Sequence, residues 1–329
     1  MTGNGRSGPG EPVARVVHDL DELAGTGEYA VTIGVFDGVH LGHRHLIGLA
    51  VESARRQGLR SLAITFEPHP EQLFRPDAPA ERLTTPAEKA ALLARTGVDA
   101  VAVVAFTPEF SRQTPEAFIG RLMATARPRE LWVGADFVFG YKRSGTPERL
   151  AELGATRGFA VHRIPRVPLP TGEALSTSAI RQALLAGDVA LAARLLGRPY
   201  ALTGVVVHGA RRGHLLGYPT ANLVPPTDLV VPANGVYATL ADVPEVVADH
   251  AAMTSVGVRP QFDNGARLIE AHLLDWDGDL YDRPLTLRFL AWLRSEEKFP
   301  SVEALVARMG RDGEETRAVV RAKELRVDC

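Results

Sequence analysis

The chain has 329 residues, of which 45% are hydrophobic and 23% are charged, a size and composition that favour two packed domains over one. Its 37 Lys and Arg residues and 39 Asp and Glu residues give a net charge of -2, so the chain has no overall attraction to nucleic acid or an anionic membrane, and any polyanion that it binds is expected to be small. The single cysteine, Cys329, excludes an intrachain disulfide, and no stretch is long and apolar enough to span a bilayer, so a cytoplasmic protein is expected.

The N-terminal half alternates strand patterns with helix patterns. Residues 1–14 are expected to be a disordered tail, because this end of the chain is rich in Gly, Ser and Pro and lacks the apolar core of a signal peptide. Apolar runs predict buried strands at Ala30–Phe36, Ser61–Phe66, Ala100–Phe106, Leu131–Val133 and Ala160–Ile164. Helices are expected between them at His43–Arg56, Pro86–Thr96, Pro115–Ala126 and Pro147–Glu152, the last three after a threonine that can cap the helix. Such alternation is typical of a parallel sheet covered on both faces, where ligands bind beyond the carboxyl ends of the strands.

The pattern changes after residue 197. Two short helices, Thr177–Ala186 and Val189–Leu196, are expected to close the first half, and Gly197-Arg198-Pro199-Tyr200 then breaks the pattern. The β-rich runs that follow are Ala201–His208, Gly235–Leu240, Ala252–Val256, Leu268–Trp276 and Leu285–Leu293. Helices are expected only near the end, at Val302–Met309 and Glu314–Leu325. The second half therefore predicts an antiparallel barrel with terminal helices.

The most informative segment joins the first predicted strand to the first helix and reads Gly34-Val35-Phe36-Asp37-Gly38-Val39-His40-Leu41-Gly42-His43. Glycines let the backbone approach a ligand, and the free N–H groups and partial positive charge of a helix N-terminus favour phosphate. His40 and His43 could form a cationic or hydrogen-bonding clamp on a nucleoside triphosphate there. The residues expected around its phosphates are Gly34, Phe36, Asp37, Gly38 and Gly42. Histidines in a turn can also be merely solvated or cap the helix, and the pattern alone leaves that alternative open.

Two further segments of the first half carry polar or aromatic side chains. At the start of a predicted helix, the hydroxyls of Ser176, Thr177 and Ser178 could bind phosphate oxygens, and Arg181 could hold a departing pyrophosphate. A plain N-cap with a surface arginine is an equal alternative. The second segment follows a predicted strand and reads Val133-Gly134-Ala135-Asp136-Phe137-Val138-Phe139-Gly140. From the residues alone, it could be a turn that packs its phenylalanines into the core.

The second half contains the segment Gly209-Ala210-Arg211-Arg212-Gly213-His214-Leu215-Leu216-Gly217-Tyr218-Pro219-Thr220-Ala221-Asn222. Its glycines, Gly209, Gly213 and Gly217, predict a backbone that can wrap phosphates. Thr220 and Asn222 are expected to point the same way on an extended segment, and their oxygens suit Mg²⁺, although both could simply satisfy a turn. Alternation on the later strand places Glu270 on the face opposite Ile269, where a lone glutamate would ordinarily be solvent-facing.

These segments, with Phe66-Glu67-Pro68-His69-Pro70, resemble in order the bacterial bifunctional riboflavin kinase/FAD synthetases, from about Val31 to Asp312. The resemblance implies a Rossmann-like α/β nucleotidyltransferase domain at residues 15–197 and a riboflavin kinase domain, an antiparallel β-barrel with terminal helices, at residues 198–329. It implies that ATP phosphorylates riboflavin to FMN in the barrel, and that the first domain adenylylates FMN to FAD and releases pyrophosphate. Both steps are expected to need Mg²⁺. The expected partners are riboflavin, FMN, FAD and ATP, without nucleic acid or membrane, and the oligomeric state is left open.

The resemblance also implies roles for individual residues. His40 and His43 would stabilise charge on the α-phosphate, and Arg181 would hold pyrophosphate. Glu270 would be the general base of the kinase step. The residues expected to bind flavin or to lie next to it are Phe66, Pro68, Asp136 and Phe137. Thr220 and Asn222 would bind MgATP.

The chain departs from the family pattern at three positions of the kinase half: Ala210, Gln261 and Asp282. Gln261 stands where Thr is usual and Asp282 where Gly is usual, and aspartate tolerates a positive φ better than most residues. Two other functions remain open. One is an adenylyltransferase that acts on a different phosphate, and the other is a flavin-binding protein in which one or both halves have lost catalysis.

Overall fold

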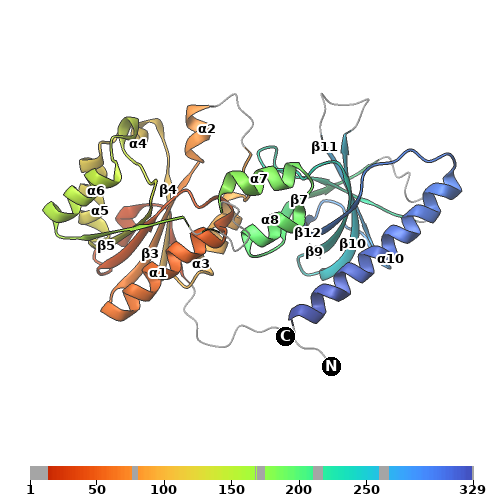
Figure 1. Ribbon diagram of the computed structural model, residues 1–329, viewed down its shortest axis with the longest axis horizontal. Coiled ribbons are helices and arrows are strands. Elements are labelled where there is room, and N and C mark those ends of the chain that lie inside the picture. The colour runs from red at the N-terminus through yellow and green to blue at the C-terminus, as the bar shows by residue number, and fades with distance from the viewer. Residues whose placement is uncertain are drawn as a thin grey trace. The chain divides into compact units, whose positions relative to one another are not determined.

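The computed structural model describes residues 14–75, 81–166, 168, 175–209, 218–258 and 267–327, and by its internal contacts it forms two compact units (Figure 1). The first unit contains the residues up to 80 and residues 84–175. The second contains residues 81–83 and those from 176 onward. The two helices that follow Ser176 thus share their contacts with the barrel, although they precede the sequence break at residue 197. Most of the expected N-terminal tail, residues 1–13, lies outside the described residues.

A six-stranded parallel sheet forms the first unit, in the order β1-β4-β3-β2-β5-β6. Its strands are β1 (Arg15–Val17), β2 (Tyr29–Ile33), β3 (Arg60–Glu67), β4 (Ala100–Ala105), β5 (Pro128–Gly134) and β6 (Ala160–Ile164). The order reverses at β2, because β3 and β4 extend the sheet on one side of it and β5 and β6 on the other. Such a switch point leaves a crevice beyond the carboxyl ends of the strands, where ligands of open α/β sheets bind.

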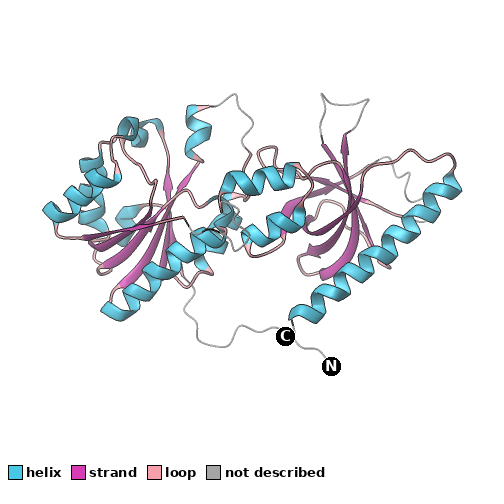
Figure 2. Ribbon diagram, viewed as in Figure 1, coloured by secondary structure: helices cyan, strands magenta, loops and turns pink. Residues whose placement is uncertain are grey.

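Helices cover both faces of this sheet (Figure 2). They are η1 (Leu20–Leu23), η2 (Asp37–Val39), α1 (Leu41–Gln57), α2 (Pro70–Phe74), α3 (Pro86–Ala94), α4 (Pro108–Ser111), α5 (Pro115–Thr125), η3 (Tyr141–Arg143) and α6 (Pro147–Arg157). The predicted caps are confirmed, since Thr85, Thr114 and Thr146 each accept a hydrogen bond from a backbone N–H of the first helical turn. Helix α6 continues past the predicted end at Glu152 until Gly158, whose φ of 82° ends it.

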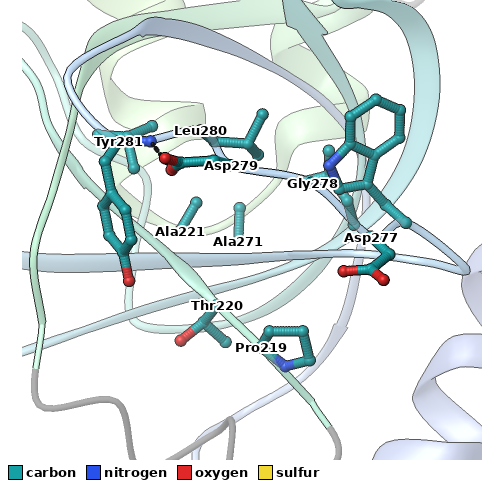
Figure 3. A pocket seen from close by; sticks show the side chains of 12 residues that line it. Pro219, Thr220, Ala221, Ala271, Asp277, Gly278, Asp279, Leu280 and Tyr281 are labelled. Atoms are coloured by element: carbon teal, nitrogen blue, oxygen red, sulfur yellow. Dashed lines mark hydrogen bonds between the residues drawn. The ribbon is translucent and has the colours of Figure 1, made fainter.

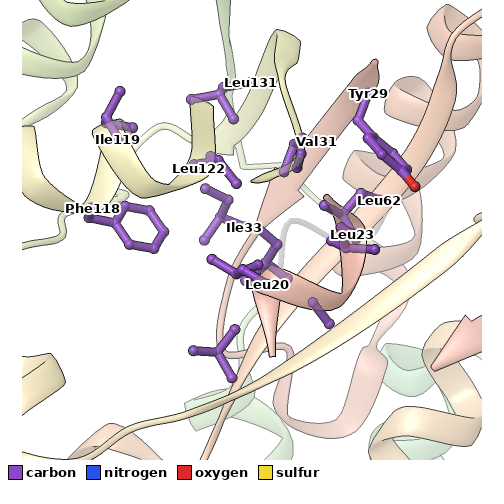
Figure 4. Packing of buried hydrophobic residues seen from close by; sticks show 14 of the residues in the cluster. Leu20, Leu23, Tyr29, Val31, Ile33, Leu62, Phe118, Ile119, Leu122 and Leu131 are labelled. Atoms are coloured by element: carbon purple, nitrogen blue, oxygen red, sulfur yellow. The ribbon is translucent and has the colours of Figure 1, made fainter. Parts of the chain in front are cut away.

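The alternation of side chains along the strands builds two cores, one on each face of the sheet. Val31 and Ile33 of β2 pack with α5, α6 and η1, and Figure 4 shows this cluster. Ala30, from the same strand, packs in the other cluster, with α1 and α3. All five residues of β2 are buried, as expected of a strand covered on both faces.

The second unit begins with α7 (Thr177–Leu185) and α8 (Val189–Leu196) and continues as a closed six-stranded barrel in the order β10-β11-β8-β7-β12-β9. The barrel strands are β7 (Tyr200–Val207), β8 (Ala221–Val224), β9 (Gly235–Val243), β10 (Val247–Val258), β11 (Arg267–Leu273) and β12 (Pro284–Arg294). Every neighbouring pair is antiparallel, so the predicted barrel is confirmed.

The prediction of two terminal helices is wrong, because one helix, α10 (Val302–Val327), runs through Gly310 and Gly313. The buried carboxylate of Asp312 holds it at this point, with Arg294 of β12 at 2.8 Å and Arg308 of the helix itself at 2.9 Å. Gly313 is buried next to Asp312, on the packed face of the helix. Among the described residues, no helix is long and apolar enough to cross a bilayer.

Candidate active sites

The predicted histidine turn lies at the carboxyl end of β2, at the switch point of the sheet. Its backbone is unusual, because Phe36, Gly38 and Val39 have φ angles of 53°, 75° and 40°. A positive φ strains a β-branched side chain such as that of Val39. Strained backbone of this kind clusters at functional sites, where the surrounding structure enforces it.

The two histidines stack on one another at the start of α1. Their ring centroids are 3.6 Å apart at an angle of 19°. His40 caps the helix, and its Nδ1 accepts a hydrogen bond from the His43 N–H at 3.3 Å. Burial and the neighbouring His40 hold the pKa of His43 well below its usual value, and its buried Nδ1 has no hydrogen-bond partner among the described residues. The sequence predicted either a cationic or a hydrogen-bonding clamp. Because the lowered pKa keeps His43 neutral, this arrangement favours the hydrogen-bonding clamp before a ligand binds.

Glycines let the aromatic rings around the histidines pack closely. A Cβ on Gly34 would lie 2.7 Å from the Phe36 ring, which turns back over it and meets the His43 ring edge-on at 5.2 Å. A Cβ on Gly42 would lie 3.2 Å from the His40 ring. Phe36 is only 2% exposed, so its ring supports His43 from behind, and a nucleotide contact by Phe36 stays a prediction. Asp37 is also buried, with the Thr84 hydroxyl 3.4 Å from its carboxylate.

A cavity of about 940 Å³ begins at Gly34 and extends along the carboxyl ends of the strands. Its wall includes the aromatic side chains of Phe66, Phe74, Phe106, Phe110, Phe118, Phe137, Phe139 and Tyr141. Three of the four residues expected to be near flavin, Phe66, Asp136 and Phe137, lie in this wall, whereas Pro68 does not. The Arg166 guanidinium, 2.5 Å from Asp136, holds the pKa of that carboxyl below its usual value.

Sequence reasoning missed much of this aromatic wall. Phe106 and Phe110 follow β4, and their rings lie 5.8 and 5.7 Å from that of Phe66. The sequence did contain a signal for them, because both phenylalanines follow a buried strand. The carboxyl ends of parallel strands meet at one edge of the sheet, so these side chains could have been expected near Phe66. His69 also lines the cavity, and its side chain caps α2.

The segment of three hydroxyls forms the start of α7, in the second unit. The Ser176 hydroxyl accepts a hydrogen bond from the Ala179 N–H, so it does cap the helix. Thr177, Ser178 and Arg181 follow on the first turns. Their predicted share in a site with His40 and His43 stays a prediction, because the contacts assign the two groups to different units.

In the barrel, two of the predicted kinase residues, Asn222 and Glu270, pair across neighbouring strands. Asn222 of β8 lies directly opposite Glu270 of β11 and, on its other side, opposite Val207 of β7. A Cβ on Gly209 would lie 2.6 Å from Asn222 Oδ1, so only glycine leaves room for this amide. Asn222 is 5% exposed, and its Oδ1 accepts no hydrogen bond from the described residues.

Thr220 lines a second cavity, of about 370 Å³, at the barrel (Figure 3). The hairpin of Asp277–Tyr281 forms another part of its wall, where the Tyr281 N–H donates to Asp279 at 2.9 Å. His272 of β11 lies on the face opposite Ile269, the face predicted for Glu270, and its Nδ1 donates to the carbonyl of Pro219 at 2.7 Å. Burial lowers the pKa of His272, so a largely neutral ring holds the residue before Thr220.

Of the three positions that depart from the family pattern, the structure describes Asp282. Asp282 has a φ of 58°, so it does occupy a left-handed position where glycine would be unstrained, and its N–H donates to the carbonyl of Val206. Gly213, Gly217, Ala210 and Gln261 lie outside the described residues. Strand β8, which carries Asn222, was not among the predicted strands.

The geometry defines a class: an α/β unit with a parallel sheet and paired histidines at its switch point, joined to a barrel that has a separate cavity. Comparison with protein-family models matches residues 24–179 to FAD synthetase and residues 196–320 to riboflavin kinase. Curated relatives described as bifunctional riboflavin kinase/FMN adenylyltransferases include those of Listeria monocytogenes, 35% identical over 88% of this chain and 91% of the relative, and Escherichia coli K12, 38% identical over 91% and 94%.

A solved structure described as a macrolide-efflux protein from Streptococcus pneumoniae has the same fold. It is 31% identical, with a TM-score of 0.83, and covers 93% of this chain and 99% of that one. Together with the matches over both units, this shows that the chain belongs to the bifunctional riboflavin kinase/FMN adenylyltransferase family. It is a transferase with both a riboflavin kinase and an FAD synthetase domain. An adenylyltransferase alone would leave the second match unexplained.

Proposed function

We propose that the first unit transfers the AMP group of ATP to FMN between the histidine turn and the cavity that begins at Gly34. An FMN phosphate oxygen attacks the α-phosphorus, forming one P–O bond while the bond to the bridging oxygen of the β-phosphate breaks. FAD and pyrophosphate result. The attacking phosphate is already ionised at neutral pH, so the step needs alignment and charge stabilisation more than proton removal.

The stacked histidines suit this role because both rings can donate hydrogen bonds to phosphate oxygens. His40 Nδ1 accepts the backbone N–H of His43, so Nε2 is the ring atom through which His40 would donate to a phosphate oxygen. A bound triphosphate would raise the pKa of His43, because nearby negative charge favours the protonated form.

We assign riboflavin phosphorylation to the barrel. Glu270 would accept the proton of the terminal ribityl hydroxyl as its oxygen attacks the γ-phosphorus of ATP and ADP leaves. This role is supported by the register of the strands, because Glu270 lies opposite Asn222, a residue that is expected to bind MgATP. Gly209 would let the backbone approach the phosphates, and Gly213 and Gly217 are expected to do the same.

The donor set of Asn222 and Thr220 fits Mg²⁺ delivered with ATP. The buried Asn222 Oδ1, which no described residue hydrogen-bonds, is a hard oxygen of the kind that this ion prefers. The two residues would hold the ion, which when bound would neutralise phosphate charge. No cluster of three or more His, Cys, Asp or Glu side chains suited to a metal occurs in the described ranges.

The observation that carries the proposal is the presence of two separate cavities. Gly34, Phe66, Asp136 and Phe137 line the first, and Thr220 lines the second together with Ala221 of the strand that carries Asn222. We place the functional boundary between residues 197 and 198, near the start of the riboflavin kinase match at residue 196. The test is chromatography of riboflavin incubated with MgATP and the purified chain. FMN and then FAD should appear. Stoichiometric riboflavin binding without ATP consumption would refute the proposal.

A further inference from the structure

Lys89 of α3 is buried although it carries a charge. Its side chain is only 4% exposed, and its Nζ lies 2.6 Å from the carboxylate of Glu67 and donates to the carbonyl of Phe66 at 2.9 Å. An ammonium group withdrawn from water is unfavourable unless it is paired, and well-packed apolar residues are often at least as stabilising as a buried ion pair. The pair therefore has a cost that stability alone does not explain.

The Glu67 carboxylate and the Phe66 carbonyl, which Lys89 contacts, both belong to the end of β3, beside the cavity with the aromatic wall. The Phe66 ring belongs to the cavity wall and contacts Phe106 and Phe110. The Glu67 carbonyl accepts the N–H of Phe106, which ties the end of β3 to the chain leaving β4. The ammonium group thus fixes the backbone at Phe66.

The segment just before α3 contacts the other part of the same site. The Thr84 hydroxyl accepts the N–H of Gly38 at 3.3 Å and lies 3.4 Å from the carboxylate of Asp37. Thr84 is 6% exposed, so this contact is also shielded from water. One short stretch of chain, residues 84–89, therefore touches both the histidine turn and the wall of the aromatic cavity.

We propose that residues 84–89 form a clasp that aligns the two substrates for adenylyl transfer, with Lys89 positioning the flavin wall and Thr84 positioning the histidine turn. Neither residue lines the cavity, so both act through the groups that they hold. The inference rests on the proposed use of this cavity for FMN. It predicts that the two ends of the clasp affect different substrates.

Lys89→Met keeps much of the apolar stem and removes the charge, and Thr84→Val removes only the hydroxyl. Because small misplacements of positioning groups cost up to about 100-fold in rate, we expect Lys89→Met to raise KM for FMN by about tenfold with KM for ATP unchanged. Thr84→Val should instead lower kcat or raise KM for ATP, with KM for FMN unchanged. Riboflavin kinase activity of the same polypeptide serves as an internal control and should stay constant.

Glu130→Gln is the matched control for loss of a buried charge. Glu130 lies near the start of β5, 8% exposed, and accepts hydrogen bonds from Gln57 and Trp132, far along the strand from the carboxyl edge. The Glu130→Gln substitution should lower Tm without changing KM for FMN or KM for ATP. Should Lys89→Met fail to fold, Glu67→Gln replaces it, with the same expected rise in KM for FMN.

Equal changes in both KM values, or no change in a folded Lys89 variant, would overturn the clasp. Wild-type chain that forms no FAD from FMN would instead refute the proposed function. The two failures are therefore distinguishable.

Discussion

Gly42→Ala tests whether the position of the His40 ring controls adenylyl transfer. A Cβ built on Gly42 lies 3.0 Å from Leu175 Cδ2, and 3.2 and 3.3 Å from Cε1 and Nδ1 of His40. Because non-bonded carbon atoms pack best at roughly 3.5–4.0 Å, the neighbours must retreat by about half an ångström. Misplacement by about 1 Å can cost about 100-fold in rate, so we expect roughly tenfold slower FAD formation.

The same substitution should not destabilise the helix. Alanine is favoured over glycine within a helix by up to about 1 kcal/mol, which offsets the crowding at Gly42. Gly48→Ala, on the same helix, is the matched control, because a Cβ there meets nothing within 4 Å. It should raise Tm by roughly 2–4 °C per kcal/mol gained and leave FAD formation unchanged.

The assay follows FAD formed from added FMN and MgATP by chromatography, with riboflavin phosphorylation measured on the same samples. Gly42→Ala should slow the first reaction only. FAD formation by Gly42→Ala at the wild-type rate would refute the reasoning, because it would show that the position of His40 is not critical.

Four further predictions follow from the two sites. Glu270→Gln should slow FMN formation by about 10²–10⁴-fold yet leave FAD formation from added FMN intact; loss of both in a chromatographic assay would show that the halves are inseparable. His43→Ala should do the reverse, so riboflavin should be converted only as far as FMN, and continued FAD output would remove His43 from the mechanism. Gly209→Ala should abolish kinase activity with FAD synthesis retained, because the added Cβ would displace the Asn222 amide; FMN formation at the wild-type rate would contradict this. Burial holds the pKa of His43 in the folded chain below its value near 6.5 in the unfolded chain. As the pH falls below about 6.5, His43 therefore takes up a proton in the unfolded chain while it stays neutral in the folded chain, and the folded state loses stability. Urea unfolding from about pH 7.5 to about pH 5.5 should show a smaller loss for His43→Ala than for wild type, and equal losses would assign the effect to other groups.

Much of the fold could be predicted from local patterns. Pro86, Pro115 and Pro147 begin helices as expected, because a threonine cap and a fixed φ act within one turn of chain. The place of the histidine turn in the fold was also predicted, since a strand that runs into a helix fixes where the intervening turn lies. The short strands β1 and β8 were missed, because three or four residues carry too little periodicity and become strands only by pairing with a neighbour.

By itself, the order of residues determined the two-domain plan, the histidine turn at the end of a parallel strand and the barrel that carries Asn222 and Glu270. Only the tertiary structure decided that His40 and His43 stack, that burial lowers the pKa of His43, that α10 passes unbroken through two glycines, and that Lys89 is buried at the end of β3. The physical reason is that burial and charge pairing depend on groups brought together from distant parts of the chain, whereas caps and alternation depend on neighbours within a few residues.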